Sequence, residues 1–279
     1  FAFKNAAGFQ HSNQFPLPLS NIIGGGEHGG NTSIQEFLVL PVNAENFPEA
    51  IQTNTAIYQE IKEKHSEKIE GINDEGSLIT SMNDEKTLEL LKIVADKHDA
   101  RLGLDIAASE FYENQKYHID SMDQVNSPSQ HLEFVQNLID RFDLVYVEDP
   151  FDEKDFKYHA RLTAQNPDIM ICGDDLFRTC KDRLEKGITN NACNSILIKP
   201  NQVGTVTQAK ETVKTAHQEN YTPVISHRSG ETIDSTISDL SLEWETPIIK
   251  AGIADIRIAK LNKLTRLWDQ INNAKINKK

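Results

Sequence analysis

The chain has 279 residues, of which 38% are hydrophobic and 25% charged, proportions that suit one large globular domain rather than a disordered or fibrous protein. Its formal net charge of −13 argues against nucleic acid or an anionic membrane as a general partner, although a local cationic pocket for an anionic substrate stays compatible with it. No apolar run approaches the roughly 20 residues of a membrane span, and no stretch has the pattern of a signal peptide.

The cysteines, Cys172, Cys180 and Cys193, are odd in number and lack the spacing of a metal finger. They predict reduced thiols in a cytoplasmic protein, packed as small core or helix residues. The first residue is Phe1 rather than methionine, which predicts that further sequence lies upstream.

A glycine-rich segment, residues 22–31, carries His28 in its middle and leads directly into a predicted strand over 34–42. That strand carries Gln35 and Glu36 near its start. Successive glycines predict a mobile loop, and two interpretations stay open. The segment is either a bare flexible turn or a loop that covers a ligand.

A helix is predicted from Asn46, which suits an N-cap, to residue 65, with Pro48 in its first turn. An acidic loop, residues 70–77, follows and contains Glu75. Acidic loops are usually solvated, so the loop alone does not assign Glu75 a role.

From residue 83 onward, amphipathic helical patterns alternate with short apolar runs, in units of about 25 residues, the pattern of a (β/α) barrel. The polar residues that follow these runs are Asp105, Glu148, Asp174, Lys199, His227 and Lys250. An open doubly wound sheet is the alternative, but it requires a glycine-rich turn that opens a helix. The glycine-rich segment here precedes a strand, which favours the barrel.

Three strand-end acids, Asp105, Glu148 and Asp174, are predicted to lie on one rim of the barrel. Converging carboxylates repel one another unless a cation lies among them, and all-oxygen ligation selects magnesium or manganese over zinc. Each acid alone would serve equally well as a helix N-cap or a surface acid, so the metal prediction rests on all three.

Cationic and polar residues are predicted across the same rim, where they suit a phosphate or carboxylate. Among them Lys199 ends a buried strand, and partial desolvation is expected to lower its basicity until it can act as a base. The alternative is a strand-end lysine that reaches solvent. The set comprises Lys199, His227, Arg228, Ser229 and Lys250.

Eight ordered segments of the chain resemble enolase over nearly its whole length. They are GGGEHGGN with IQEF (24–37), NDEGS (73–77), LDIAASEFY (104–112), VEDPF (147–151), GDDLF (173–177), ILIKPNQVGT (196–205), SHRSGET (226–232) and IIKAG (248–252). The resemblance implies an α/β fold, a TIM-type (β/α)8 barrel of the enolase kind. It also implies the reaction of a hydro-lyase: magnesium-dependent, reversible dehydration of 2-phosphoglycerate to phosphoenolpyruvate in glycolysis and gluconeogenesis.

The resemblance also implies roles, position by position. It makes Asp105, Glu148 and Asp174 the Mg²⁺ ligands, with Lys199 as the base and Glu75 as the acid. It places around the substrate His28, Gln35, Glu36, His227, Arg228, Ser229 and Lys250. Two neighbouring glutamates cannot both ionise cheaply, so Glu36 and Glu75 are expected to share a proton. A cytoplasmic homodimer or higher homo-oligomer is expected for the full-length form.

Several positions depart from the enolase pattern. The usual DEGG is DEGS at 74–77, Phe-Ala-Pro is absent from 78–80, position 200 is proline, and 254–257 replaces Arg-Ser-Glu-Arg. The largest departure is the absence of the family's N-terminal domain, whose serine-bearing loop closes over the metal. We therefore expect residues 1–21 to be a linker left from that domain, residues 22–279 to be the catalytic barrel, and the chain to be a weakly active form.

Two rival functions stay open. A sugar-acid dehydratase or racemase would share the three acids but has no reason to carry SHRSGET together with Lys250. A non-catalytic protein-binding module is the other, with a basic tail that would engage another protein through Lys275, Lys278 and Lys279.

Overall fold

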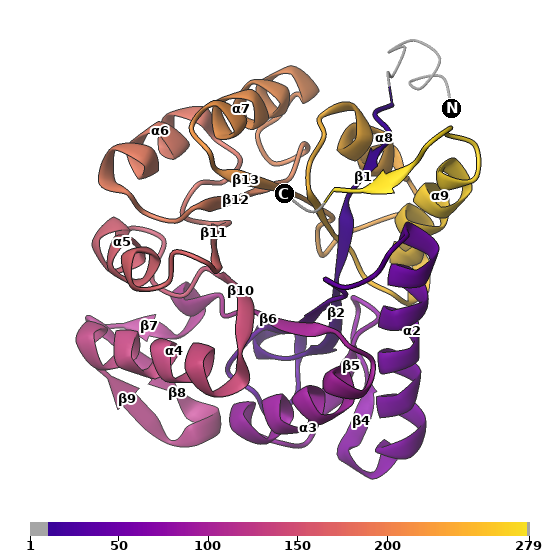
Figure 1. Ribbon diagram of the computed structural model, residues 1–279. Helices are drawn as coiled ribbons and strands as arrows, with labels where there is room; N and C mark the ends of the chain where they lie inside the picture. The colour runs from indigo at the N-terminus through magenta and orange to yellow at the C-terminus, as the bar shows by residue number, and fades with distance from the viewer. Residues whose placement is uncertain (1–10, 278–279) are drawn as a thin grey trace.

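The computed structural model describes residues 11–277, which form a closed barrel with helices around its outside (Figure 1). The barrel wall, in order, consists of β2 (Leu17–Gly24), β3 (Glu36–Leu40), β6 (Arg101–Asp105), β10 (Leu144–Glu148), β11 (Met170–Gly173), β12 (Ser195–Ile198), β13 (Thr222–Ser226) and β14 (Ile248–Lys250). Pairing of β14 with β2 closes the wall. The predicted TIM-type barrel is therefore confirmed.

One strand of the wall runs against the others. β3 pairs antiparallel with both β2 and β6, whereas the remaining pairs in the wall are parallel. The start of β3 consequently lies at the carboxyl ends of its neighbours, where Glu36 is opposite Asp105. This reversal brings a residue from the beginning of a strand to the rim.

Helices cover the outer face of the wall (Figure 1). They are α2 (Phe47–Lys64), α3 (Asp84–Lys97), α4 (Pro128–Phe142), α5 (Phe156–Gln165), α6 (Lys181–Asn190), α7 (Val206–Gln218), α8 (Thr236–Glu243) and α9 (Ile258–Trp268). Asn46 caps α2 as predicted, because its side-chain oxygen accepts a 2.9 Å hydrogen bond from the backbone N–H of Glu49. None of the helices in residues 11–277 is long and apolar enough to span a membrane.

Short strands outside the wall were not predicted from the sequence. β4 (Ile69–Ile72) and β5 (Leu78–Thr80) form a hairpin that extends the sheet beside β2. The predicted acidic loop is therefore shorter than residues 70–77, since its first three residues belong to β4 and only residues 73–77 form the turn. A separate sheet comprises β7 (Tyr112–Glu113), β8 (Lys116–Ile119) and β9 (Gln124–Asn126). β1 (Gln14–Phe15) pairs in parallel with β15 (Lys275–Ile276).

The barrel wall begins earlier than the sequence analysis placed it. Residues 17–21 were predicted to be linker, but they are buried in β2, and Leu17 to Leu19 pair with β14. Proline, serine and asparagine interrupt the apolar residues of this segment, so it lacks the continuous apolar pattern of a strand that is buried on both faces. Residues 1–10 of the predicted linker lie outside the described part of the chain, as do Lys278 and Lys279 of the predicted tail.

Candidate active site

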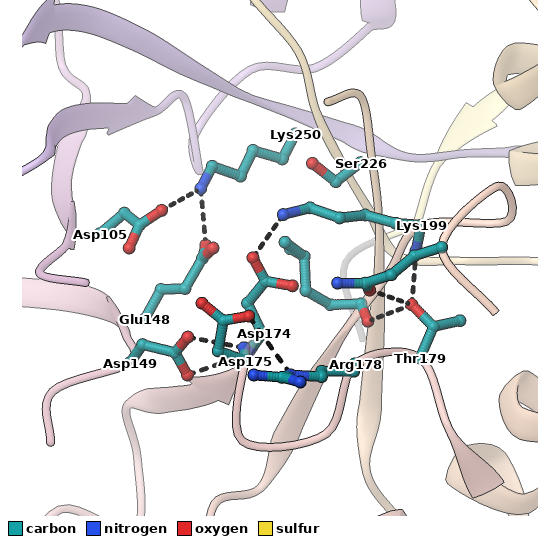
Figure 2. A network of polar contacts seen from close by, with 12 residues as sticks. Asp105, Glu148, Asp149, Asp174, Asp175, Arg178, Thr179, Lys199, Ser226 and Lys250 are labelled. Atoms are coloured by element: carbon teal, nitrogen blue, oxygen red, sulfur yellow. Dashed lines mark hydrogen bonds and ion pairs between the residues drawn. The ribbon is translucent and has the colours of Figure 1, made fainter. Parts of the chain in front are cut away.

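Lys250 is the centre of the acidic half of the rim (Figure 2). Its Nζ lies 2.8 Å from carboxylate oxygens of Glu36, Asp105 and Glu148, and its side chain is only 4% exposed. Strand register produces this convergence, since Asp105 pairs with Glu36 on one side and with Glu148 on the other. One buried ammonium is thus shared by three carboxylates.

Burial and mutual charge shift the pKa values of these groups. Burial alone would lower the pKa of Lys250, but the surrounding carboxylates outweigh burial and raise it well above its usual range. The pKa of Glu148 is raised by burial and then by Asp105. Burial also acts to raise the pKa of Asp105, but Lys250 outweighs it and the value is lowered. Lys250 is therefore a fixed positive charge.

Lys199 projects from the end of β12 and donates a hydrogen bond from Nζ to Asp174 Oδ2, as Figure 2 shows. The expectation that desolvation lowers the basicity of Lys199 is wrong. Burial does act in that direction, but the carboxylates of Asp174 and Glu148 outweigh it and raise the pKa. The lysine is held in its charged form by the same carboxylates that were predicted to bind metal.

Asp149 positions the loop that carries Asp174. It is buried, its φ is 40°, and its two carboxylate oxygens accept hydrogen bonds from the backbone N–H groups of Asp174 (2.9 Å) and Asp175 (2.7 Å). Asp149 was not predicted from the sequence. A second acid directly after a strand-end acid, as in VEDPF, was the available signal.

A second cluster combines Glu36, Glu75 and His227, all buried, whose potential ligand atoms lie within 4.8 Å of one another. Its carboxylate charges already have cationic neighbours, Lys250 at 2.8 Å from Glu36 and Arg257 at 3.7 Å from Glu75. Burial chiefly raises the pKa of Glu36 to about 7, with Asp105 and Glu75 adding smaller increases against the opposing effect of Lys250. The raised pKa of Glu36 therefore makes this cluster suited to hold a proton near neutral pH.

Arg257 is a site residue that the sequence analysis missed. It is 1% exposed, and its guanidinium donates from Nη1 to the carbonyl of Asp74 at 2.7 Å and from Nη2 to the carbonyl of Ser229. It thus ties the acidic loop to the loop after β13. A charged residue at a helix start is common, and only the tertiary contacts reveal this role.

The acidic loop places Glu75 in a turn that depends on Gly76, whose φ is 79°. Ser77, which replaces the second glycine of the enolase pattern, donates from Oγ to Asn73 Oδ1 at 2.8 Å and accepts from Asn21. These contacts accommodate the serine within the loop, and Glu75 remains buried.

The remaining predicted substrate residues lie on loops. Arg228 and Ser229 follow β13 and are exposed, whereas His227 is buried and its pKa is lowered by burial and by neighbouring cations. Gln35 is half-buried, and its backbone N–H donates to the carbonyl of Asp105. The side chain of His28 lies outside what the structure describes.

The predicted metal ligands suit a hard cation. Glu148 Oε1 and Asp174 Oδ1 are buried and lack a hydrogen-bond partner within residues 11–277. Buried carboxylate oxygens without partners are costly, and Mg²⁺ prefers such oxygens. The residues present therefore fit a divalent cation bound by oxygen.

A family model described as "Enolase, C-terminal TIM barrel domain" matches residues 12–278. The chain belongs to the enolase family. The enolase of Natronomonas pharaonis is 41% identical over 278 residues, which cover 95% of this chain and 69% of that protein. The enolase of Haloarcula marismortui is 42% identical, and the match covers 96% of this chain and 69% of that protein. The enolase of Methanosphaera stadtmanae is 43% identical, and the match covers 93% of this chain and 67% of that protein.

Membership of the enolase family makes the chain a lyase, a phosphopyruvate hydratase, that uses a metal ion and a small-molecule substrate. The resemblance stated from the sequence motifs is thereby confirmed.

Proposed function

We propose that this rim dehydrates 2-phosphoglycerate to phosphoenolpyruvate, with Asp105, Glu148 and Asp174 as ligands of Mg²⁺. The observation that carries this proposal is the shared position of Lys250, 2.8 Å from both Asp105 and Glu148, beside two unpartnered carboxylate oxygens. When bound, Mg²⁺ would supply positive charge to the substrate carboxylate and would compensate the Asp174 charge that keeps Lys199 protonated.

Proton removal is assigned to Lys199. A proton alpha to an ionised carboxylate is very weakly acidic, because its removal adds charge to oxygens that are already negative. Lys250, held cationic by its surroundings, is suited to stabilise that charge. Lys199 pairs with one carboxylate and its side chain is 18% exposed, so it is the lysine that can exchange a proton.

Departure of the hydroxide requires an acid, which we assign to Glu75 together with Glu36. Hydroxide is a poor leaving group, so its oxygen must be protonated as the bond breaks. A Glu36 pKa near 7 supports one shared proton on this pair at neutral pH. Arg257 holds the acid loop in place through the carbonyl of Asp74.

Isotope exchange separates the base from the acid. Glu75→Gln should still exchange the C2 proton of 2-phosphoglycerate with solvent deuterium while losing phosphoenolpyruvate formation, because proton removal comes first. Lys199→Ala should lose both, and Lys210→Ala, at an exposed lysine, is the matched control that should lose neither. A Glu75→Gln variant that binds substrate without exchanging the proton would reject these roles.

We further propose that catalysis needs a capping domain like the N-terminal part of the relatives. The carboxylates and lysines stand on strand ends and should keep their positions without it, whereas water at an open rim screens their charges. Supplying the N-terminal part of the Natronomonas enolase should raise the rate far more than it changes Mg²⁺ affinity. Equal rates with and without it, at saturating Mg²⁺, would contradict the proposal.

A cytoplasmic location and a homodimer or higher homo-oligomer complete the proposal. The free cysteines, Cys172, Cys180 and Cys193, suit a reducing compartment. Sedimentation of the chain with the capping domain added would test the oligomeric state.

A further inference from the structure

Tyr146 is an unusual residue in the interior of the barrel. It lies two positions before Glu148 on β10, so both side chains point to the same face of the strand. Its side chain is fully buried among aliphatic residues of the interior, including Leu38, Leu197 and Val224. A phenylalanine would fill this layer equally well, so the hydroxyl calls for an explanation.

The hydroxyl of Tyr146 donates a 2.5 Å hydrogen bond to Glu148 Oε2. The same oxygen accepts from Lys250 Nζ at 2.8 Å. Glu148 Oε1, in contrast, is buried without a hydrogen-bond partner among the described residues. Two donors therefore hold one oxygen of the carboxylate and leave the lone pairs of the other unused.

We infer that Tyr146 is a positioning residue that orients Glu148 as a metal ligand, with Oε1 as the ligating oxygen. The inference rests on the proposed role of Glu148 in binding Mg²⁺. Residues that hydrogen-bond to a ligand fix its orientation, and their removal typically weakens metal affinity about 10–100-fold. Lys250 alone cannot replace the phenol, because its ammonium is also shared with Asp105 and Glu36.

A purely structural role makes a different prediction. A buried tyrosine hydroxyl usually finds some partner, and Glu148 could merely satisfy it. In that case, removing the hydroxyl would change the thermal stability and leave metal affinity unaltered. Metal affinity is therefore the readout that separates the two roles.

The test is calorimetric titration of Mg²⁺ into the chain, with no substrate present. Tyr146→Phe should weaken Mg²⁺ binding about 10–100-fold. Tyr221→Phe is the matched control, since this buried tyrosine donates to the carbonyl of Ala192 at 2.9 Å, away from the rim, and its loss should leave affinity unchanged. If Tyr146→Phe does not fold, Tyr146→Met removes the hydroxyl with a more adaptable side chain. Once the capping domain is added, the phenylalanine variant should recover its rate at high Mg²⁺.

Glu148→Gln, titrated in parallel, separates failure of the inference from failure of the proposed function. Loss of Mg²⁺ binding in Glu148→Gln with parental affinity in Tyr146→Phe would overturn the role of Tyr146 and leave the metal site standing. Parental affinity in Glu148→Gln would overturn both. Equal losses in Tyr146→Phe and Tyr221→Phe would also overturn the inference, because the effect would then be general.

Discussion

Lys250 and Arg228 are both cations at the rim, but the fold holds them in opposite ways. Lys250 ends a strand, is 4% exposed and is shared by three carboxylates at 2.8 Å. Arg228 lies two residues beyond the end of β13 and is exposed. The strand-borne charge is fixed by its surroundings, whereas the loop-borne charge faces solvent. Preorganised charge stabilises a transition state without reorganisation at the moment of reaction.

Replacing Lys250 should lower the free energy of unfolding more than any other substitution at the rim. Lys250→Met leaves three carboxylates facing one another, and removing one partner of a buried ion pair typically costs about 3–5 kcal/mol. Urea unfolding in EDTA should show that loss of stability. Lys210→Met, which breaks an exposed pair with Glu243, should cost about 0–1 kcal/mol. Similar costs for the two variants would show that burial does not distinguish these cations.

The raised pKa of Glu36 should make the free energy of unfolding depend on pH. The pKa of Glu36 is raised from 4.5 to about 7, so the free energy of unfolding falls as the pH rises from 4.5 to 7, because the unfolded chain loses this proton while the folded chain keeps it. Glu36→Gln removes the cost, and in EDTA it should match the parent near pH 4 and exceed it by on the order of 3 kcal/mol at pH 8. Glu60, whose pKa is lowered to about 2 by His98 and Lys97, is the opposite case. Glu60→Gln should lose stability relative to the parent as the pH rises from about 2 to 4.5, the window of this lowered pKa. The same sign in both variants, each within its own window, would contradict the assignment.

Asp174 is expected to link the thermal stability of the protein to Mg²⁺ binding. A ligand at 100 times its dissociation constant stabilises a protein by about 2.7 kcal/mol. Asp174→Asn should lose most of this Mg²⁺-dependent stabilisation in thermal unfolding. Asp175→Asn, next in the chain and half-buried, should retain it. Unchanged stabilisation in the Asp174 variant would remove this residue from the metal site.

Arg228 should show the smallest effect on stability. Arg228→Met is expected to change the free energy of unfolding by no more than about 0.5 kcal/mol, as is usual for surface substitutions. With the capping domain supplied, however, the KM for 2-phosphoglycerate should rise. A large loss of stability would mean that this loop is held as firmly as the strand ends.

The strand-borne part of the site was largely predictable from the sequence. An apolar run that ends on Asp105, Glu148 or Lys250 fixes the side chain at a strand end, and the closed wall then brings strand ends together. The start of the wall at Leu17 was missed, because a buried strand interrupted by proline and serine lacks a clear periodic pattern. The reversal of β3 was missed too, since a single strand pattern carries no direction.

Properties that depend on several segments at once could not be predicted. The basicity of Lys199 was expected to fall through desolvation, but the charge of Asp174, 25 positions earlier, decides the direction. Arg257 joins carbonyls of Asp74 and Ser229, 183 and 28 positions away. Such contacts are set by the packing of loops rather than by any local pattern.

The short pair of β1 with β15 places Gln14 beside Lys275 and Phe15 beside Ile276. The two ends of the described chain are therefore adjacent, in a small sheet beside the barrel wall. A short linker should be able to join these ends while new termini are opened in a surface loop elsewhere, since adjacent termini generally permit circular permutation. The order in which the eight strands of the wall are synthesised is thus separable from the geometry of the rim. A permuted chain could begin at a different strand and still assemble the same lysines and carboxylates.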